Sequence, residues 1–172
     1  MLRGMLRRFL VPILLVLLAF GVFLWWWNLP ERVVARRVKG LFEAANVPAD
    51  MSNIGRAARG SSLEPYLAKN ITFEGPDGPT ERIEGPQSRD FIMNSYSYAA
   101  TACRSATVED IEVEEVTVNG DGADVKASID AVIEMPDGDK PVDGIQHLEM
   151  KWLKQDGSWK LSRAKWRESG RK

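Results

Sequence analysis

The stretch that decides the fold is GADVKASIDAVIEM, residues 122–135. Every odd-numbered position in it is apolar, whereas Lys126, Ser128 and Asp130 alternate with the apolar positions. Successive side chains of a strand point to opposite faces of a sheet, so this period of two predicts a long strand with one buried face.

The segments on either side continue the strand pattern. In TVEDIEVEEVTVNG (107–120) the apolar positions change phase, which predicts a β-bulge at 114–115. On the other side, IQHLEMKWLKQ (145–155) and SWKLSRAKWRE (158–168) are separated by the hairpin signal Asp156-Gly157. These four segments predict a strongly bent sheet of long antiparallel strands.

The region before these strands predicts three helices and two short strands. PERVVARRVKGLFEAANV (30–47) has apolar residues at helical spacing, and a short helix falls within 50–59. PQSRDFIMNSYSYAATAC (86–103) predicts the third helix. NITFEG (70–75) and TERIEG (80–85) predict the short strands. The class is therefore α+β, with the helices over the concave face of the sheet.

The N-terminus has a different character. Phe9 to Trp27 form an uncharged run, FLVPILLVLLAFGVFLWWW, which as a helix spans about 28 Å, close to the hydrocarbon core of a bilayer at about 30 Å. Trp25, Trp26 and Trp27 suit the membrane–water interface. A cleaved signal peptide is the alternative, but its apolar run is usually shorter and WWWNLPER offers no small-residue cleavage site. We expect a basic tail (1–8), a transmembrane anchor (9–27) contacting the lipid bilayer, and one soluble domain (28–172).

The orientation of the anchor follows from its flanks. Lys and Arg lie on both sides of it, so a count of basic residues is nearly balanced. A short tail is easily retained, and a long domain translocates largely regardless of its charge. We expect the N-terminus in the cytoplasm and the domain outside, in the periplasm or the extracellular space.

Composition excludes several classes of site. The net charge is -1 at pH 7, so no global basic field favours nucleic acid. A single His and a single Cys exclude sites built from several histidines or cysteines. We therefore expect no metal, no cofactor and no nucleic-acid partner.

The element order, with LEPYLAKNITFEGPDG (63–78) and HLEMKWLKQDGSWKLSRAKW (147–166), resembles the nuclear-transport-factor-2-like (NTF2-like) superfamily, also called SnoaL-like. The family pattern of a penultimate strand ending in "W…DG.W" is matched by Trp152, Asp156-Gly157 and Trp159. The resemblance covers about residues 30 to 168 and implies a cone of three helices on a strongly bent antiparallel sheet.

The resemblance also allows catalysis to be tested by position. Steroid-isomerase-like members carry a general-base aspartate after the first strand, and the matching position here is Gly75. Their oxyanion-donating aspartate matches Gln146. Dehydratase-like members use two pocket histidines, which this chain does not have. Since glycine cannot take a proton, the resemblance favours a protein that is not an enzyme, with no catalytic residue.

Two functions from different classes fit this reading. In the first, the protein is a membrane-anchored, non-catalytic binding or assembly module, a scaffold or accessory subunit of a larger membrane or envelope complex. It would contact a protein partner, or a second copy of itself, through the outer face of the sheet. Strand alternation places six polar residues on that face: Lys126, Ser128, Asp130, His147, Glu149 and Lys151.

In the second, the cone binds a small apolar ligand, with isomerase or lyase activity as a possible addition. The pocket is then expected to be lined by Phe73, Phe91, Tyr96, Ile129, Gln146, Leu148, Met150 and Trp152. Gln146 would be its polar group. A cavity of about 300 Å³ or more favours this function, and a filled cone favours the first.

Overall fold

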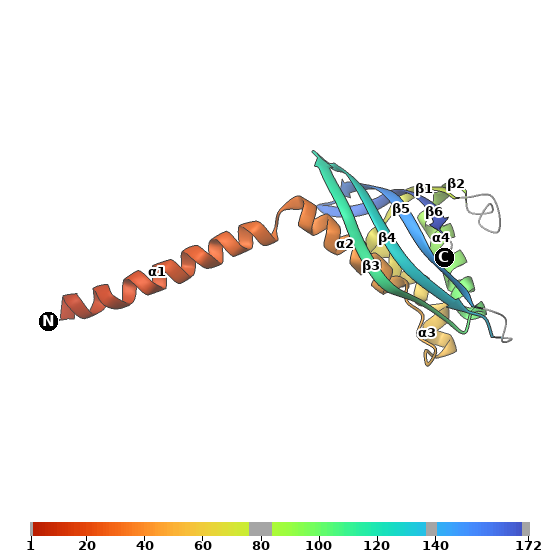
Figure 1. Cartoon of the computed structure of the whole chain (residues 1–172), viewed down its shortest axis with the longest axis horizontal. Coiled ribbons are helices and arrows are strands. Elements are labelled where there is room, and N and C mark those ends of the chain that lie inside the picture. The colour runs from red at the N-terminus through yellow and green to blue at the C-terminus, as the bar shows by residue number, and fades with distance from the viewer. Residues whose placement is uncertain (1, 76–83, 137–140, 170–172) are drawn as a thin grey trace.

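A long N-terminal helix stands away from a domain in which helices cover one face of a bent sheet (Figure 1). The structure is a computed structural model and describes residues 2–75, 84–136 and 141–169. The first helix is α1 (Leu2–Trp27), and the helices of the domain are α2 (Pro30–Ala45), α3 (Asn53–Ala57), the 3₁₀ helix η1 (Arg59–Tyr66) and α4 (Arg89–Ala102).

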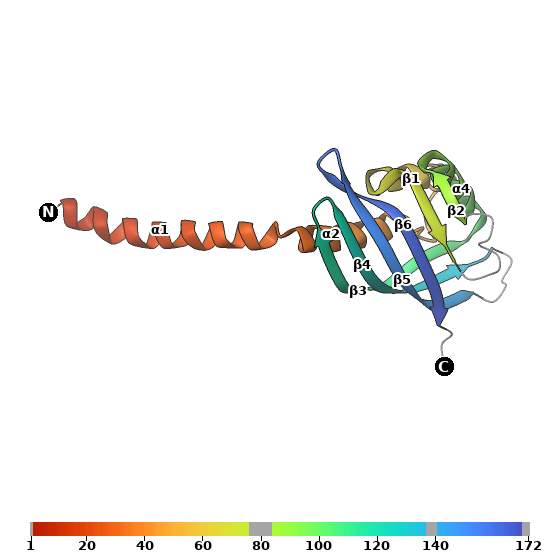
Figure 2. The same ribbon diagram turned by 90° about the horizontal axis from the view of Figure 1, so that it is seen from above.

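The sheet has six strands: β1 (Leu67–Glu74), β2 (Gly85–Ser88), β3 (Ser105–Asn119), β4 (Gly122–Glu134), β5 (Val142–Gln155) and β6 (Ser158–Ser169). Their order is β2-β1-β6-β5-β4-β3, as the strands can be followed in Figure 2. The four long strands are antiparallel as predicted, but β1 pairs with β6 in parallel, so the sheet is mixed. The expectation of a wholly antiparallel sheet was therefore wrong. It rested on the tight turns, which join antiparallel neighbours, whereas β1 and β6 are not joined by a turn and can pair in parallel.

The predicted bulge lies in β3. Val113 pairs with Ala127 and Glu115 pairs with Lys126, so Glu114 is the extra residue. A bulge shifts the alternation of the strand by one position. Apolar residues before and after Glu114 therefore point to the same inner face, as the phase change in the sequence indicated.

The register of β3 also shifts between Val108 and Ile111, and a bulge that was not predicted lies in β6. Trp152 pairs with Leu161 and Lys151 with Arg163, so Ser162 is the extra residue. Its hydroxyl donates a hydrogen bond to the carbonyl oxygen of Lys151, at 3.0 Å. Four residues of β6 consequently share the inner face, although two have odd and two have even numbers: Trp159, Leu161, Ala164 and Trp166.

The second short strand and the third helix differ from the expectation. Most of the segment expected as a strand, 80–83, lies outside the described residues, and β2 is formed by GPQS instead. The helix begins at Arg89 rather than at Pro86, because Ser88 caps it by accepting a hydrogen bond from the backbone N–H of Phe91 at 3.2 Å.

The core lies between α2 and the inner face of the sheet. Val34, Val38 and Leu41 follow one face of α2 and are buried. Trp152, which is fully buried on β5, belongs to the same cluster. Burying these side chains contributes about 2 kcal/mol each, so the apolar stripe of α2 fixes the helix against the sheet.

Arg56 of α3 is buried, although arginine rarely is. Its guanidinium group donates to six carbonyl oxygens, those of Pro48, Ala49, Met51, Ala100, Cys103 and Arg104. Two of these belong to the C-terminal end of α4, where the helix dipole favours a cation. Arg56 therefore ties α3, α4 and the start of β3 together.

Candidate functional site

An apolar cavity of about 370 Å³ lies between the inner face of the sheet and the helices α2 and α4. Its wall is formed by Leu41, Phe42, Ala45, Leu63, Leu67, Phe73, Ile92, Ser95, Tyr96, Ala99, Leu148, Met150, Leu161, Ala164 and Trp166. The volume exceeds the 300 Å³ or so from which small-molecule sites begin. The cone is therefore not filled by its own side chains.

The polar side-chain groups among these lining residues are the hydroxyls of Ser95 and Tyr96 and the indole N–H of Trp166. The Tyr96 hydroxyl donates to the carbonyl oxygen of Ala45, the last residue of α2. Burial raises the pKa of Tyr96 to about 12, although the nearby Arg59 opposes the shift. The phenol therefore keeps its proton at physiological pH, and that proton is directed at a backbone carbonyl.

Gly75 follows β1 and lies against the ring of Trp166. A Cβ atom at Gly75 would be 2.5 Å from Cζ2 of Trp166, closer than real Cβ atoms come to other heavy atoms. Trp166 also meets Phe73 edge to face, with 6.2 Å between ring centres. The position that the resemblance matches to a general base thus has neither a carboxylate nor room for one.

Half of the residues expected to line a pocket line this cavity: Phe73, Tyr96, Leu148 and Met150. The other four do not. Phe91 is 44% exposed in the first turn of α4. Ile129 and Gln146 pair with each other beyond the Leu148–Trp166 pair, further along the sheet. Trp152 is packed in the core near the β5–β6 turn.

The sequence-based prediction missed the contribution of three elements, α2, η1 (through Leu63) and β6. Leu41, Phe42 and Ala45 come from α2, and a single helix pattern does not say which of its apolar residues border a space. Trp166 was missed because it has the opposite parity to Trp159, and only the bulge at Ser162 brings both to the inner face. The phase change in β6 was the available signal.

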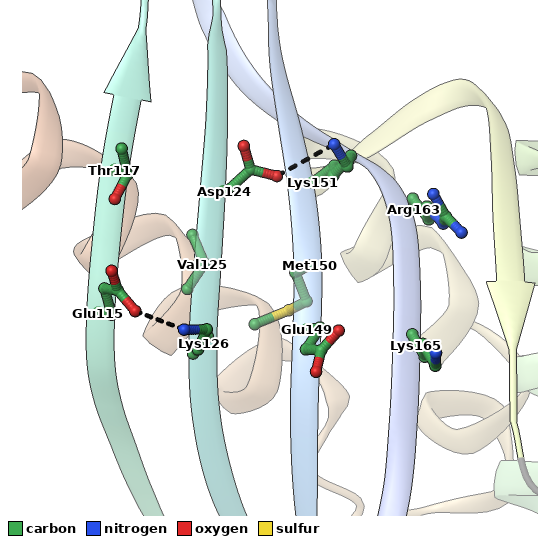
Figure 3. Close-up of a pocket in the computed structure, with 10 residues that line it drawn as sticks. All are labelled: Glu115, Thr117, Asp124, Val125, Lys126, Glu149, Met150, Lys151, Arg163 and Lys165. Carbon is green, nitrogen blue, oxygen red and sulfur yellow. Dashed lines mark hydrogen bonds and ion pairs between the residues drawn. The ribbon is translucent and has the colours of Figure 1, made fainter.

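The outer face of the sheet carries a second hollow, of about 400 Å³ (Figure 3). Charged side chains from four strands surround it, and its lining is Glu115, Thr117, Asp124, Val125, Lys126, Glu149, Met150, Lys151, Arg163 and Lys165. Lys126 meets Glu115 at 2.7 Å and Lys151 meets Asp124 at 3.2 Å. The bond to Glu115 raises the pKa of Lys126.

The register arranges these charges in a row across the sheet. Glu115 is opposite Lys126, Lys126 opposite Glu149, and Glu149 opposite Lys165. Opposite charges directly across from one another stabilise a sheet modestly. The row alternates in sign from an acidic end on β3 to a basic end on β6.

The residues expected to form an interaction face lie on this outer side. Lys126, Glu149 and Lys151 line the hollow. Ser128 and His147 pair with each other in the next row, where His147 is exposed and its Nε2 is 3.1 Å from the hydroxyl of Ser169. Asp130 follows one row further, opposite Ile145.

No group of three or more His, Cys, Asp or Glu side chains in the described part of the chain is arranged to hold a metal ion. Across 2–75, 84–136 and 141–169, no single helix is both long and apolar enough for a membrane crossing; residues 13–27 and α2 reach that level only as a pair, with a bend of 61° between them.

Comparison with known proteins identifies the fold. No protein-family model and no curated protein matches the chain. A ketosteroid isomerase-like protein of Erwinia carotovora atroseptica is 14% identical with a TM-score of 0.61, over 84% of this chain and 99% of that one. An NTF2-like protein of Cytophaga hutchinsonii is 16% identical with a TM-score of 0.55, over 80% of this chain and 96% of that one.

A conserved protein of Planctomyces limnophilus gives a TM-score of 0.60 at 12% identity, over 81% of this chain and 98% of that one. At such identities a shared fold does not carry a shared activity. The comparisons and the cone of helices on a curved mixed sheet together show that the domain of this chain has the NTF2-like, or SnoaL-like, α+β fold.

Proposed function

We propose that the protein is a membrane-anchored, non-catalytic NTF2-like module that binds an uncharged apolar molecule in its cone. The observation that carries the proposal is the cavity of about 370 Å³, whose lining is apolar apart from two hydroxyls and one indole N–H. A cavity with such a wall favours ligands without charge, because a buried charge needs a partner that this wall does not offer.

The absence of catalysis rests on the chemistry of the wall. Tyr96 is the titratable side chain among the described lining residues, and its pKa is raised to about 12. A general base needs a pKa near the working pH. Trp166 fills the space at Gly75, where the resemblance would place a carboxylate.

The anchor is supported by the exposed surface of α1. The chain has no charged residue between Arg8 and Glu31. From residue 13 to 27, the large apolar side chains of α1 are exposed. A stretch of this kind is stabilised when lipid covers it. The orientation proposed is a cytoplasmic N-terminus with the domain outside, which protease added to spheroplasts would test by digesting the domain.

The cavity is tested by filling it and asking what the protein then retains. Ser95→Leu and Ala45→Leu place larger side chains at two positions of the wall. The full chain and each variant are purified in mild detergent, extracted with organic solvent and compared by mass spectrometry. We expect a compound present in near-stoichiometric amount with the wild type and depleted at least tenfold from both variants.

Asn94→Leu is the matched control, because Asn94 precedes Ser95 on α4 but is exposed. It adds the same side chain outside the cavity and should retain the compound. Equal retention by all four proteins, or no compound in the wild type, contradicts the ligand-binding function.

A second function is favoured by the charged hollow on the outer face. There a second copy of the chain could dock, because the row from Glu115 to Lys165 is acidic at one end and basic at the other. A copy turned through 180° would place its basic end against the acidic end of the first. Such an interface is polar and of the modest kind that charge complementarity steers.

The oligomeric state of the full chain tests this assembly function. Lys126→Glu with Lys165→Glu reverses two charges of the row and should convert a dimer to a monomer in light scattering of the detergent complex. Lys69→Glu with Lys154→Glu, at exposed lysines outside the hollow, should leave the dimer intact. A wild type that is monomeric at every concentration contradicts the assembly function.

A further inference from the structure

At the junction between α1 and α2, the last carbonyl oxygens of α1 are all hydrogen-bonded. Asn28 and Leu29 donate their backbone N–H groups to three of the last four carbonyl oxygens of α1, at 3.0 to 3.4 Å. The fourth, that of Trp27, accepts a hydrogen bond at 2.9 Å from Nη1 of Arg36, nine positions further on. All four carbonyls that a helix end leaves unpaired are thus satisfied, and the first turns of α2 have a defined position beside the tryptophans.

Two arginines of α2 stack on these tryptophans. The guanidinium carbon of Arg32 is 3.3 Å from the centre of the Trp26 ring. That of Arg36 is 4.6 Å from the centre of the Trp27 ring. Cation–π contacts of this kind hold a guanidinium flat on the ring face. Both positive charges are therefore held at the tryptophan cluster, one helical turn apart.

The two guanidinium groups keep donors for a partner outside the chain. Each has five N–H bonds, and Arg36 uses one of them on Trp27. Among the residues that the structure describes, no carboxylate forms an ion pair with either group. Glu31, the acidic residue in the first turn of α2, is not among the carboxylates that form ion pairs in the described residues.

The neighbouring Arg37 shows the contrast. It donates to the carbonyl oxygens of Pro65 and Trp159 and stacks on the ring of Tyr66, all within the domain. Arg37 thus fixes α2 to the domain. Arg32 and Arg36 instead contact the tryptophans at the end of α1.

We propose that Arg32 and Arg36 form a binding site for the phosphate group of an anionic phospholipid, a proposal that rests on the membrane anchoring proposed above. Tryptophans at the end of a transmembrane helix lie at the level of the lipid headgroups. Arginines stacked on them lie at the same depth, and a guanidinium binds phosphate oxygens in bidentate fashion.

The test uses the full chain reconstituted into phosphatidylcholine vesicles that contain dibrominated phosphatidylglycerol or dibrominated phosphatidylcholine at the same mole fraction. Bromine quenches tryptophan fluorescence on contact, so the ratio of quenching gives the relative binding constant of the two lipids at the α1–α2 junction. We expect a ratio of about five or more in favour of phosphatidylglycerol, since one basic residue at an anionic surface contributes about that factor.

Arg32→Gln with Arg36→Gln should bring the ratio close to one. Arg104→Gln with Arg167→Gln is the charge-matched control, because both arginines are exposed and lie where β3 begins and β6 ends, on the side of the domain away from α1 (Figure 2). The control should keep the wild-type ratio.

Two results would overturn the lipid site: a wild-type ratio near one, or a high ratio that survives in the Arg32→Gln, Arg36→Gln variant. Quenching by neither brominated lipid would be a different failure. It would show that the tryptophans do not reach the bilayer, and it would overturn the anchor itself.

Discussion

The indole ring of Trp166 occupies the space beside Gly75, so that a Cβ added to this glycine would lie 2.5 Å from Cζ2 and 2.7 Å from Cε2 of the ring. Each residue directly follows a member of the last registered pair of β1 and β6, Glu74 and Lys165. The ring of Trp166, which lines the cavity, therefore occupies the space that a side chain at position 75 would need.

Gly75→Ala is expected to destabilise the protein by about 1–3 kcal/mol, the usual range for overpacking. Trp166→Leu should relieve the clash, so the double variant should lose less stability than the sum of the two single variants. Urea unfolding of the full chain in mild detergent measures this coupling. Strict additivity would contradict the contact.

Gly60→Ala is expected to lower the free energy of unfolding by about 3 kcal/mol, the upper end of the range for an added methyl group. A Cβ at Gly60 would lie 1.9 Å from the backbone oxygen of Met93, so η1 and α4 would have to move apart. Gly122→Ala is the control, because its Cβ would be 3.5 Å from the oxygen of Asn119, an ordinary contact. In thermal unfolding, Gly60→Ala should have a clearly lower midpoint temperature than Gly122→Ala.

Arg56→Met is expected to cost about 3 kcal/mol, since it removes charged donors from buried carbonyl groups. Arg104→Met should change stability by less than about 0.5 kcal/mol, because that side chain is 69% exposed and 4.0 Å from Glu134. If the two variants unfold at the same urea concentration, Arg56 does not have the role described.

Tyr96→Phe is expected to remove part of the pH dependence of stability. Burial raises the pKa of Tyr96 from 10.0 to about 12. Above pH 10 the unfolded chain loses this proton while the folded chain retains it, so the wild type should lose up to about 2 kcal/mol as the pH rises toward 12.

Below pH 10, Tyr96→Phe should cost about 1 kcal/mol for the lost hydrogen bond to Ala45. Between pH 10 and 12 its stability should fall less steeply than that of the wild type. Urea unfolding at a series of pH values measures both effects, and parallel curves would contradict them.

Much of the sheet was predictable because the face to which a strand residue points follows from its immediate neighbours in the sequence. The alternation around Val125 and the phase change at Glu114 each indicate a face, and both predictions hold in the register. The β1–β6 pairing was not predictable, because neither segment says which distant strand it will meet. The position of the bulge at Ser162 could have been inferred by the same reasoning that located Glu114.

The candidate site was less predictable than the sheet. Strand parity correctly placed Leu148 and Met150 on the inner face. It did not show where packed side chains end and empty space begins, which depends on how α2 and α4 lie over the sheet. Nothing in the local sequence of Arg56 indicates burial either, since three of its carbonyl partners, Ala100, Cys103 and Arg104, are distant in the sequence.

The parallel pairing of β1 with β6 has a consequence for biosynthesis. Because β6 lies between β1 and β5, the early strands β1 and β2 join the rest of the sheet only through the strand that the ribosome produces last among the described elements. Contacts between distant segments form slowly because a long loop must first close. During translation, β1 therefore lacks its parallel partner until β6 has been made.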